Sequence, residues 1–340
     1  MARRVRRSAW TRSFQRTLGA LTRAPVRAGA KAAKRAVKQA TKSTRSATAR
    51  RTAPAAAGRW TTGVALGPAG ARRYRVCKPP GARAAAPRPL LVMLHGCQQD
   101  SAAFARSTRI HALAAREGFF VLCPDQDRLA NAQGCWNWYE TRSGRAHTEA
   151  ATIVAAIDQV CAQHAVDPQR IAVAGMSAGA SMAALLALRY PQRFAAVAMH
   201  SGITPGMAHS SATALSAMHG RRKAAPLPAE ALPPLLVIQG SADLVVRASN
   251  GRAAAEWWAG AASARAVAAR SVQHGKRHPT TLTDYKLKGR TLVTLCEVSG
   301  LGHAWSGGAA RQPYSDPKGP DASRMIWSFA TRQFQSAAKQ

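Results

Sequence analysis

Short apolar runs alternate with amphipathic, helix-like stretches along most of this chain, and this alternation limits the folds open to it. The apolar runs are too short for buried helices, and most end at or near glycine or proline, which is typical of buried parallel strands. Strands are expected at 89–96, 119–124, 170–176, 194–202 and 232–240. Helices are expected at 101–117, 147–164, 178–190, 248–260 and 321–335. Strands that alternate with helices predict a largely parallel sheet covered by helices on both faces.

Four further patterns complete the expected α/β architecture. The stretch "RRYRVCKP" (72–79) alternates like a half-buried strand. Residues 281–300 predict a hairpin that turns at Lys288-Gly289. Residues 203–232, rich in Pro, Ser and His, predict an insertion over the active face. Thr148 is the expected N-cap of the helix at 147–164.

The positive charge of the chain is concentrated at its beginning. Of the 49 Lys and Arg residues, 17 lie in residues 1–59, where there is no Asp or Glu; the first acidic residue is Asp100. The remaining 32 basic residues are offset by 15 acidic ones. We therefore divide the chain into a basic Ala/Arg/Lys-rich arm, 1–59, and a domain, 60–340, that carries the α/β pattern. The arm has too few large apolar residues to form a core, which predicts a disordered or partly helical segment.

The arm suggests several partners. Its apolar residues Trp10, Phe14, Leu18 and Leu21 have the spacing of one helix face, and arginines flank that face. Such a helix suits an anionic lipid or granule surface, whereas scattered Lys and Arg also suit the phosphates of nucleic acid. A solvated tail with no fixed partner is an equally simple interpretation.

The arm also bears on the location of the protein. The longest uncharged stretch before Arg23 is 17–22, which is shorter than the apolar core of a secretory signal. No run of residues is long and apolar enough to predict a transmembrane segment. These features predict a cytoplasmic protein, and the basic arm could attach it to storage granules. Secretion is the alternative prediction.

The sequence "GMSAG" (175–179) places a serine between two glycines, where the strand at 170–176 meets the helix at 178–190. One interpretation is a nucleophile, Ser177, on a sharp strand-to-helix turn; the other is a tight turn that only needs small residues. A serine nucleophile also needs a base and a carboxylate that orients the base, and where the serine stands on such a strand-to-helix turn the chain order is Ser, then Asp or Glu, then His. Asp243, after the strand at 232–240, and His303, in a glycine-flanked loop, satisfy that order.

Other residues compete poorly for these roles. His95 lies next to a turn that precedes the serine and is expected to be structural. His200 follows Ser177 but precedes Asp243, which is the wrong order for the base. The cysteines and histidines lack the spacing of a zinc site, and the predicted chemistry calls for neither a metal nor a cofactor.

Five stretches of the sequence occur together in the order found in one family. They are "LHGCQQ" (94–99), "GCWNWY" (134–139), "DPQRIAVAGMSAGASM" (167–182), "QGSADLVVRASNG" (239–251) and "GLGHAWSGG" (300–308). On these motifs, residues 88–335 resemble the poly(3-hydroxybutyrate) depolymerase family of esterases. The resemblance implies an α/β-hydrolase fold and hydrolysis of carboxylic esters by Ser177, Asp243 and His303.

The tetrahedral intermediate of ester hydrolysis needs donors for its oxyanion. One is expected to be the N–H of Ala178, directly after the nucleophile and at a helix N-terminus. The resemblance implies that the second is the N–H of Cys97. Cys97 and Cys135 lie in two active-face loops that carry family motifs, and a disulfide between them is one hypothesis; an oxidising compartment favours it and the cytosol opposes it. Cys123, Cys161 and Cys296 lie in apolar patterns and are expected to be buried thiols.

Aromatic residues gather in the two loops expected near the nucleophile. Trp136, Trp138, Tyr139 and Trp305 offer apolar rings with few mobile torsions, which suits a neutral polyester or an acyl chain. The alternative is that these rings only fill the core beneath a long loop.

Three functions remain in view at this point. The first is a serine esterase acting on poly(3-hydroxybutyrate), its oligomers or short-chain esters. The second is a feruloyl or acetyl-xylan type carbohydrate esterase. The third is non-enzymatic: a granule-, lipid- or DNA-binding protein that acts through residues 1–59. The complete Ser, Asp, His order favours an enzyme.

Overall fold

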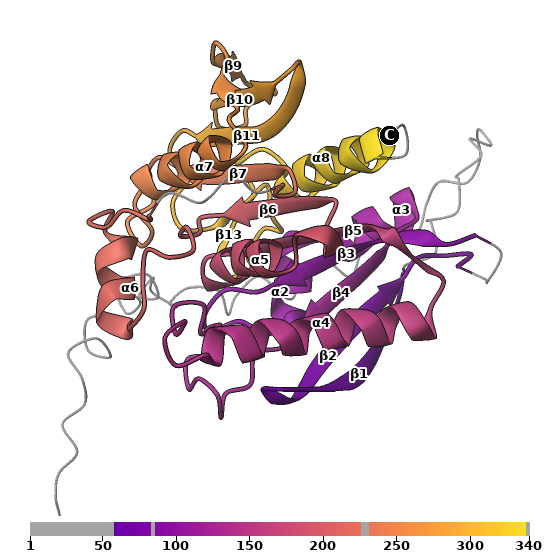
Figure 1. The fold of residues 1–340 in the computed structure, drawn as a ribbon. Helices are drawn as coiled ribbons and strands as arrows, with labels where there is room; N and C mark the ends of the chain where they lie inside the picture. The colour runs from indigo at the N-terminus through magenta and orange to yellow at the C-terminus, as the bar shows by residue number, and fades with distance from the viewer. Residues whose placement is uncertain (1–57, 83–85, 226–230, 338–340) are drawn as a thin grey trace, which may run out of the picture. The chain divides into compact units, whose positions relative to one another are not determined.

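The computed structural model describes residues 58–82, 86–225 and 231–337 (Figure 1). The first strand, β1 (Arg59–Gly67), begins at the last residue of the predicted arm. Residues 1–57 of the arm, including the pattern of Trp10, Phe14, Leu18 and Leu21, lie outside the described residues.

The described residues form one large sheet of eleven strands, in the order β1-β2-β4-β3-β5-β6-β7-β11-β10-β8, with β9 beside β10. From β4 to β11 the neighbouring strands are parallel, while β2 and β10 run antiparallel to their neighbours. The predicted, mostly parallel sheet is therefore confirmed. The strands after β1 are β2 (Gly70–Lys78), β3 (Arg88–Leu94), β4 (Phe120–Pro124), β5 (Val166–Met176), β6 (Ala196–His200), β7 (Leu235–Gly240), β8 (Arg265–Ala266), β9 (Arg270–Val272), β10 (Thr280–Leu287) and β11 (Arg290–Val298).

Helices cover both faces of this sheet (Figure 1). One face packs against α4 (Arg145–Gln163), α5 (Ala178–Arg189) and α7 (Ser249–Ala261). The other face packs against α2 (Ser101–Thr108), α3 (Ile110–Glu117) and α8 (Ala322–Ala337). The remaining elements are the 3₁₀ turn η1 (Pro191–Arg193), α6 (Ser211–Met218) and a small parallel pair, β12 (Trp305–Ser306) with β13 (Ser315–Asp316).

Burial on both faces explains why the central strands read as continuous apolar runs. In β3, Leu90, Val92 and Leu94 belong to the apolar cluster on the α4 and α5 side. Leu91 and Met93 belong to the cluster on the α8 side. A strand with polar residues at either set of positions would bury them without partners, so the sequence allows no alternation here.

Two sequence predictions about the elements were wrong in detail. The single helix expected at 101–117 is broken at Arg109, whose φ of 53° is left-handed, into α2 and α3. Thr148 is not an N-cap, because α4 begins earlier, at Arg145, and the Thr148 hydroxyl donates to Arg145 O within the first turn. In the region 203–232, for which the sequence predicts an insertion without naming its elements, the structure has the helix α6 with a capping box at Ser210.

Candidate active site

The candidate nucleophile stands on a strained turn between β5 and α5. Ser177 has φ 56° and ψ −120°, outside the conformations that a residue with a side chain prefers. Such a conformation costs on the order of 1–3 kcal/mol, and the surrounding structure must hold it. Hydrogen bonds do so on both sides, from Ser177 N to His200 O at 2.9 Å and from Ser181 N to Ser177 O at 3.1 Å.

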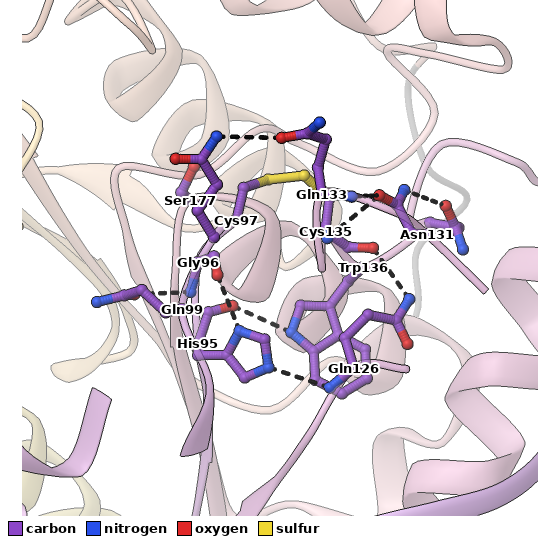
Figure 2. The surroundings of a disulfide bond; sticks show 12 residues. His95, Gly96, Cys97, Gln99, Gln126, Asn131, Gln133, Cys135, Trp136 and Ser177 are labelled. Atoms are coloured by element: carbon purple, nitrogen blue, oxygen red, sulfur yellow. Dashed lines mark hydrogen bonds between the residues drawn. A yellow bond between two sulfur atoms is a disulfide. The ribbon is translucent and has the colours of Figure 1, made fainter. Parts of the chain in front are cut away.

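The two glycines around Ser177 are required by close backbone contacts. A Cβ at Gly175 would lie 2.3 Å from the backbone of Gly179, and a Cβ at Gly179 would lie 2.2 Å from Leu94 O. The helix α5 therefore starts in direct contact with the end of β3. This contact brings the turn at Ser177 next to the turn at Gly96 and Cys97 (Figure 2).

Asp243 lies in the loop after β7, fully enclosed by protein. Its Oδ1 accepts the N–H groups of Val245 and Val246, at 3.0 and 2.9 Å. Its Oδ2 accepts from Nδ1 of His303 at 2.8 Å. Burial alone would raise the pKa of Asp243, but the hydrogen bond and charge of His303, with the two N–H groups, outweigh it and lower that pKa below its ordinary value. The carboxylate is therefore ionised at neutral pH.

The loop that carries His303 is joined to the loop that carries Asp243. Ser241 N donates to Val298 O, Ala242 N donates to Leu301 O, and Gly300 N donates to the hydroxyl of Ser241. These bonds hold the His303 ring, whose side chain is 11 % exposed, against the buried carboxylate. The predicted Asp–His pair is thus formed by two loops some sixty residues apart in the chain.

The structure brings Ser177 to the same edge of the sheet but does not complete the triad. Among the described residues, no hydrogen bond joins the hydroxyl of Ser177 to the ring of His303. Catalytic hydrogen bonds are often long before substrate binds. His200 links the turn at Ser177 to the segment after His303. Its ring Nε2 accepts from Ser306 N at 3.1 Å, and its backbone carbonyl accepts from Ser177 N.

The chain order excludes His200 as the base, and its surroundings in the structure are those of a packing residue. Its ring is fully buried and stacks on Trp305 with 5.0 Å between the ring centroids. Burial, reinforced by the charge of His303, lowers the pKa of His200 to about 3. The ring is therefore neutral at neutral pH, with Nε2 available to accept from Ser306 N.

This buried histidine predicts a loss of stability in acid. An unfolded histidine binds a proton below about pH 6.5, whereas folded His200 does so only near pH 3. Between these values the free energy of unfolding should fall as the pH falls, with His200 contributing about 1.4 kcal/mol per pH unit. His200→Gln, which keeps an acceptor for Ser306, should flatten this dependence in urea unfolding at pH 4.5 to 7.5. An equal slope of unfolding free energy against pH in the wild type and in His200→Gln would contradict the claim that His200 causes the loss of stability in acid.

The two expected oxyanion donors lie on adjacent turns. Ala178 begins α5, so its N–H is one of those that a helix leaves without an internal partner. Cys97 follows the end of β3, where Figure 2 shows it beside Gly96 and Ser177. Neither N–H donates to another described residue. Their role as the oxyanion hole stays a prediction that this arrangement supports.

The structure joins Cys97 and Cys135 as a disulfide, which was one of the two possibilities open from the sequence (Figure 2). The bond links the turn after β3 to the long loop between β4 and α4. The other four cysteines are free thiols; Cys77, Cys123 and Cys296 are buried and Cys161 is half-buried.

The aromatic residues expected to bind substrate are buried instead. Trp136 and Trp305 have no exposed surface, and Trp138 and Tyr139 are 7 % and 6 % exposed. The indole N–H of Trp136 donates to His95 O, and that of Trp305 donates to the hydroxyl of Ser323. Burial therefore favours the packing role for these rings, because nothing of Trp136 or Trp305 faces solvent in this structure.

The described part of the chain has neither a membrane-spanning helix nor a metal-binding cluster. No helix there is long and apolar enough to cross a membrane. Residues 58–82, 86–225 and 231–337 also contain no group of three or more His, Cys, Asp or Glu side chains placed to hold a metal ion.

Solved structures with a similar arrangement of strands and helices identify the fold. An acetyl xylan esterase from Aspergillus awamori superposes with a TM-score of 0.55 at 18 % identity, over 72 % of this chain and 94 % of that one. At this identity the likeness concerns the fold alone. The chain has the α/β-hydrolase fold that the sequence predicts.

Comparison of sequences gives closer relatives. The chain is 38 % identical over 131 residues to poly(3-hydroxyalkanoate) depolymerase C of Paucimonas lemoignei, a match over 38 % of this chain and 31 % of that protein. It is 30 % identical over 116 residues to feruloyl esterase B of Neurospora crassa, over 34 % and 39 % of the two chains. The chain thus spans about a third of the length of these two relatives.

A sequence model described as Esterase PHB depolymerase matches residues 72–256. The matched segment includes Ser177 and Asp243 and both cysteines of the disulfide, while His303 lies beyond its end. It covers more than half of the chain, and the chain therefore belongs to the Esterase PHB depolymerase family.

Proposed function

We propose that this protein is a serine esterase that hydrolyses carboxylic esters through an acyl-enzyme on Ser177. The observation that carries the proposal is the 2.8 Å hydrogen bond between Asp243 and His303, at the sheet edge where Ser177 occupies a strained turn. A turn that needs only small residues does not require a buried Asp–His pair beside it. A surface-binding protein would not require one either.

In the acylation step, Nε2 of His303 takes the proton of the Ser177 hydroxyl as the oxygen attacks the ester carbonyl. Asp243 holds the ring with Nδ1 protonated, so that Nε2 is the free base, and stabilises the imidazolium that forms. The carbonyl oxygen becomes an anion and is bound by the N–H groups of Cys97 and Ala178. His303 then returns the proton to the leaving alcohol as the carbon–oxygen bond breaks.

Deacylation follows the same chemical steps, with water in place of Ser177 as the nucleophile. His303 takes one proton from water, the hydroxide attacks the acyl carbonyl, and the same two N–H groups bind the second oxyanion. Collapse of this intermediate releases the carboxylic acid and returns the proton to Ser177.

For the substrate we propose poly(3-hydroxybutyrate), its oligomers or short-chain esters. The support is the name and similarity of the depolymerase relative. A feruloyl or acetyl-xylan type esterase is the second candidate, because the similarity to feruloyl esterase B covers a comparable part of the chain.

A panel of esters tests this choice. The purified full-length chain is assayed on 4-nitrophenyl butyrate and octanoate, amorphous poly(3-hydroxybutyrate), hydroxybutyrate oligomers, methyl ferulate and acetylated xylan. We expect hydrolysis of the butyrate ester and release of 3-hydroxybutyrate units from polymer or oligomers. A higher kcat/KM on methyl ferulate or acetylated xylan would favour the second candidate. No hydrolysis of any ester would contradict the proposed function.

The disulfide bears on the compartment in which the enzyme works. Disulfides persist in oxidising environments and are rare in the reducing cytosol. We therefore favour the secreted alternative over the cytoplasmic location that the sequence first suggested. The partners suggested for residues 1–59, an anionic granule or membrane surface or nucleic acid, stay predictions.

Mapping of free thiols checks the disulfide. The native protein is unfolded without reductant, alkylated and digested, and its cysteine peptides are identified by mass spectrometry. We expect label on Cys77, Cys123, Cys161 and Cys296, and on Cys97 and Cys135 only after reduction. Full labelling of Cys97 and Cys135 before reduction would contradict the disulfide and the preference for an oxidising compartment.

A further inference from the structure

The loop between β4 and α4 holds the turn that carries Cys97. The Cys97–Cys135 disulfide links the two segments, and the indole N–H of Trp136 donates to His95 O at 3.0 Å (Figure 2). Because His95 and Cys97 lie on either side of Gly96, these two contacts fix both ends of the turn. The position of the Cys97 N–H therefore depends on residues 135 and 136.

Gln126 forms a second connection between the same segments. Its backbone N–H donates to Nε2 of His95 at 3.0 Å, and its side-chain amide donates to Cys135 O at 2.9 Å. The amide oxygen accepts from the guanidinium of Arg72, a buried side chain that lies over the Trp136 ring. Gln126 thus contacts both the turn after β3 and the loop that is bonded to it.

A buried carboxylate lies beneath this arrangement. Glu149, on α4, is 1 % exposed and accepts three N–H groups: Asn137 N at 2.9 Å, Asn137 Nδ2 at 2.6 Å and Gln126 Nε2 at 2.8 Å. In the described part of the chain, no cationic side chain forms an ion pair with it. A buried carboxylate is costly unless donors surround it, so these three bonds hold the loop on both sides of Cys135 and Trp136.

We propose that Glu149 is a positioning residue for the oxyanion hole. By fixing Gln126 and Asn137, it sets the place of Cys135 and Trp136, and through them the N–H of Cys97. Glu149 acts through these residues and does not touch the substrate. The inference rests on the proposed function, because the direction of the Cys97 N–H affects the reaction only if Ser177 forms a tetrahedral intermediate.

Glu149→Gln tests the role with the smallest change in shape. A glutamine has one acceptor oxygen, and its NH₂ group must face at least one of the three donors. The loop should therefore shift and misalign one oxyanion donor. Because removal of such a donor costs about 10²- to 10³-fold in kcat, we expect kcat/KM of the variant to fall at least about tenfold. Glu140→Gln is the matched control, since Glu140 lies on the loop that Glu149 is proposed to hold, but its side chain pairs with Arg145 at the surface.

Inhibitor affinity separates positioning from a loss of folded protein. A butyl trifluoromethyl ketone adds to Ser177 and leaves an oxyanion in the hole, whereas the butyl methyl ketone binds without forming a stable adduct. Inhibition constants do not depend on the fraction of folded enzyme. We expect Glu149→Gln to raise the inhibition constant of the trifluoromethyl ketone by the same factor by which it lowers kcat/KM. The inhibition constant of the methyl ketone should change less than about twofold.

Each outcome of this experiment decides between the two claims. An unchanged trifluoromethyl ketone constant in Glu149→Gln would overturn the positioning role and leave the esterase intact. A wild-type protein that neither hydrolyses esters nor binds the trifluoromethyl ketone would overturn the proposed function itself. If Glu149→Gln does not fold, Asn137→Ala replaces it. That variant removes one of the three donors to Glu149 and keeps the carboxylate. The inhibition constant of the trifluoromethyl ketone should rise severalfold, and an unchanged constant would overturn the positioning role.

Discussion

Replacement of Ser177 by alanine is expected to lower kcat on 4-nitrophenyl butyrate by about 10⁴- to 10⁶-fold, because the nucleophile and its covalent intermediate are lost. The residual rate should come from the oxyanion donors and from substrate binding alone. The burst of 4-nitrophenol that accompanies acylation should disappear in a stopped-flow measurement.

The control for this variant is Ser249→Ala, at an exposed position at the start of α7. It should keep the wild-type burst and turnover. Circular dichroism should show that both variants retain their helices, since neither change removes a buried apolar contact. Near-normal turnover by Ser177→Ala would rule out the acyl-enzyme mechanism.

Replacement of Asp243 by asparagine is expected to lower kcat by about 10⁴-fold with the fold intact. The amide oxygen of the variant must still accept from Val245 and Val246, so its NH₂ group is turned toward His303. Nδ1 of His303 then has to accept, and the ring proton moves to Nε2. A histidine in that tautomer cannot take the proton of Ser177.

A second Asp–His contact in the chain provides the control. Asp316 Oδ2 lies 3.2 Å from Nε2 of His278, neither residue belongs to the candidate triad, and Asp316→Asn makes the same change from aspartate to asparagine. Its kcat should stay within about twofold of wild type. Equal losses in the two variants would mean that Asp243 acts only through general stability.

The chain order of the candidate triad could be predicted because each member follows a strand end with its own local signal. Gly175 and Gly179 mark a turn at which two backbones touch, and the glycines around His303 mark a loop. Parallel strands bring their carboxyl ends to one edge of the sheet, so residues far apart in sequence meet there. The fold followed from the same alternation of strands and helices.

Other features depend on contacts that sequence periodicity does not contain. The helix break at Arg109 is invisible in the pattern, and its guanidinium donates to Gly307 O, nearly two hundred residues away. The aromatic residues of "GCWNWY" were placed in the correct loop, but a motif does not say whether its rings face inward or outward. The packing of that loop against α4 and the end of β3 decided their burial.

The buried polar residues beneath the loop were also missed. Glu149 follows the expected N-cap Thr148 and drew no prediction of its own, and Gln126 and Asn137 carried no individual signal. The signal that could identify Glu149 from the sequence is a carboxylate on the apolar, buried face of an amphipathic helix. Only the structure shows which donors surround that carboxylate.

The central claim is that the fold makes the hydroxyl of Ser177 a nucleophile, and covalent labelling tests it most directly. The native protein is treated with diethyl 4-nitrophenyl phosphate, from which an activated serine displaces 4-nitrophenolate, and the digest is analysed by mass spectrometry. We predict one diethylphosphoryl group per chain, on Ser177, and none when the protein is unfolded before treatment. An unmodified Ser177 in native protein, or a label on another residue, would contradict the account.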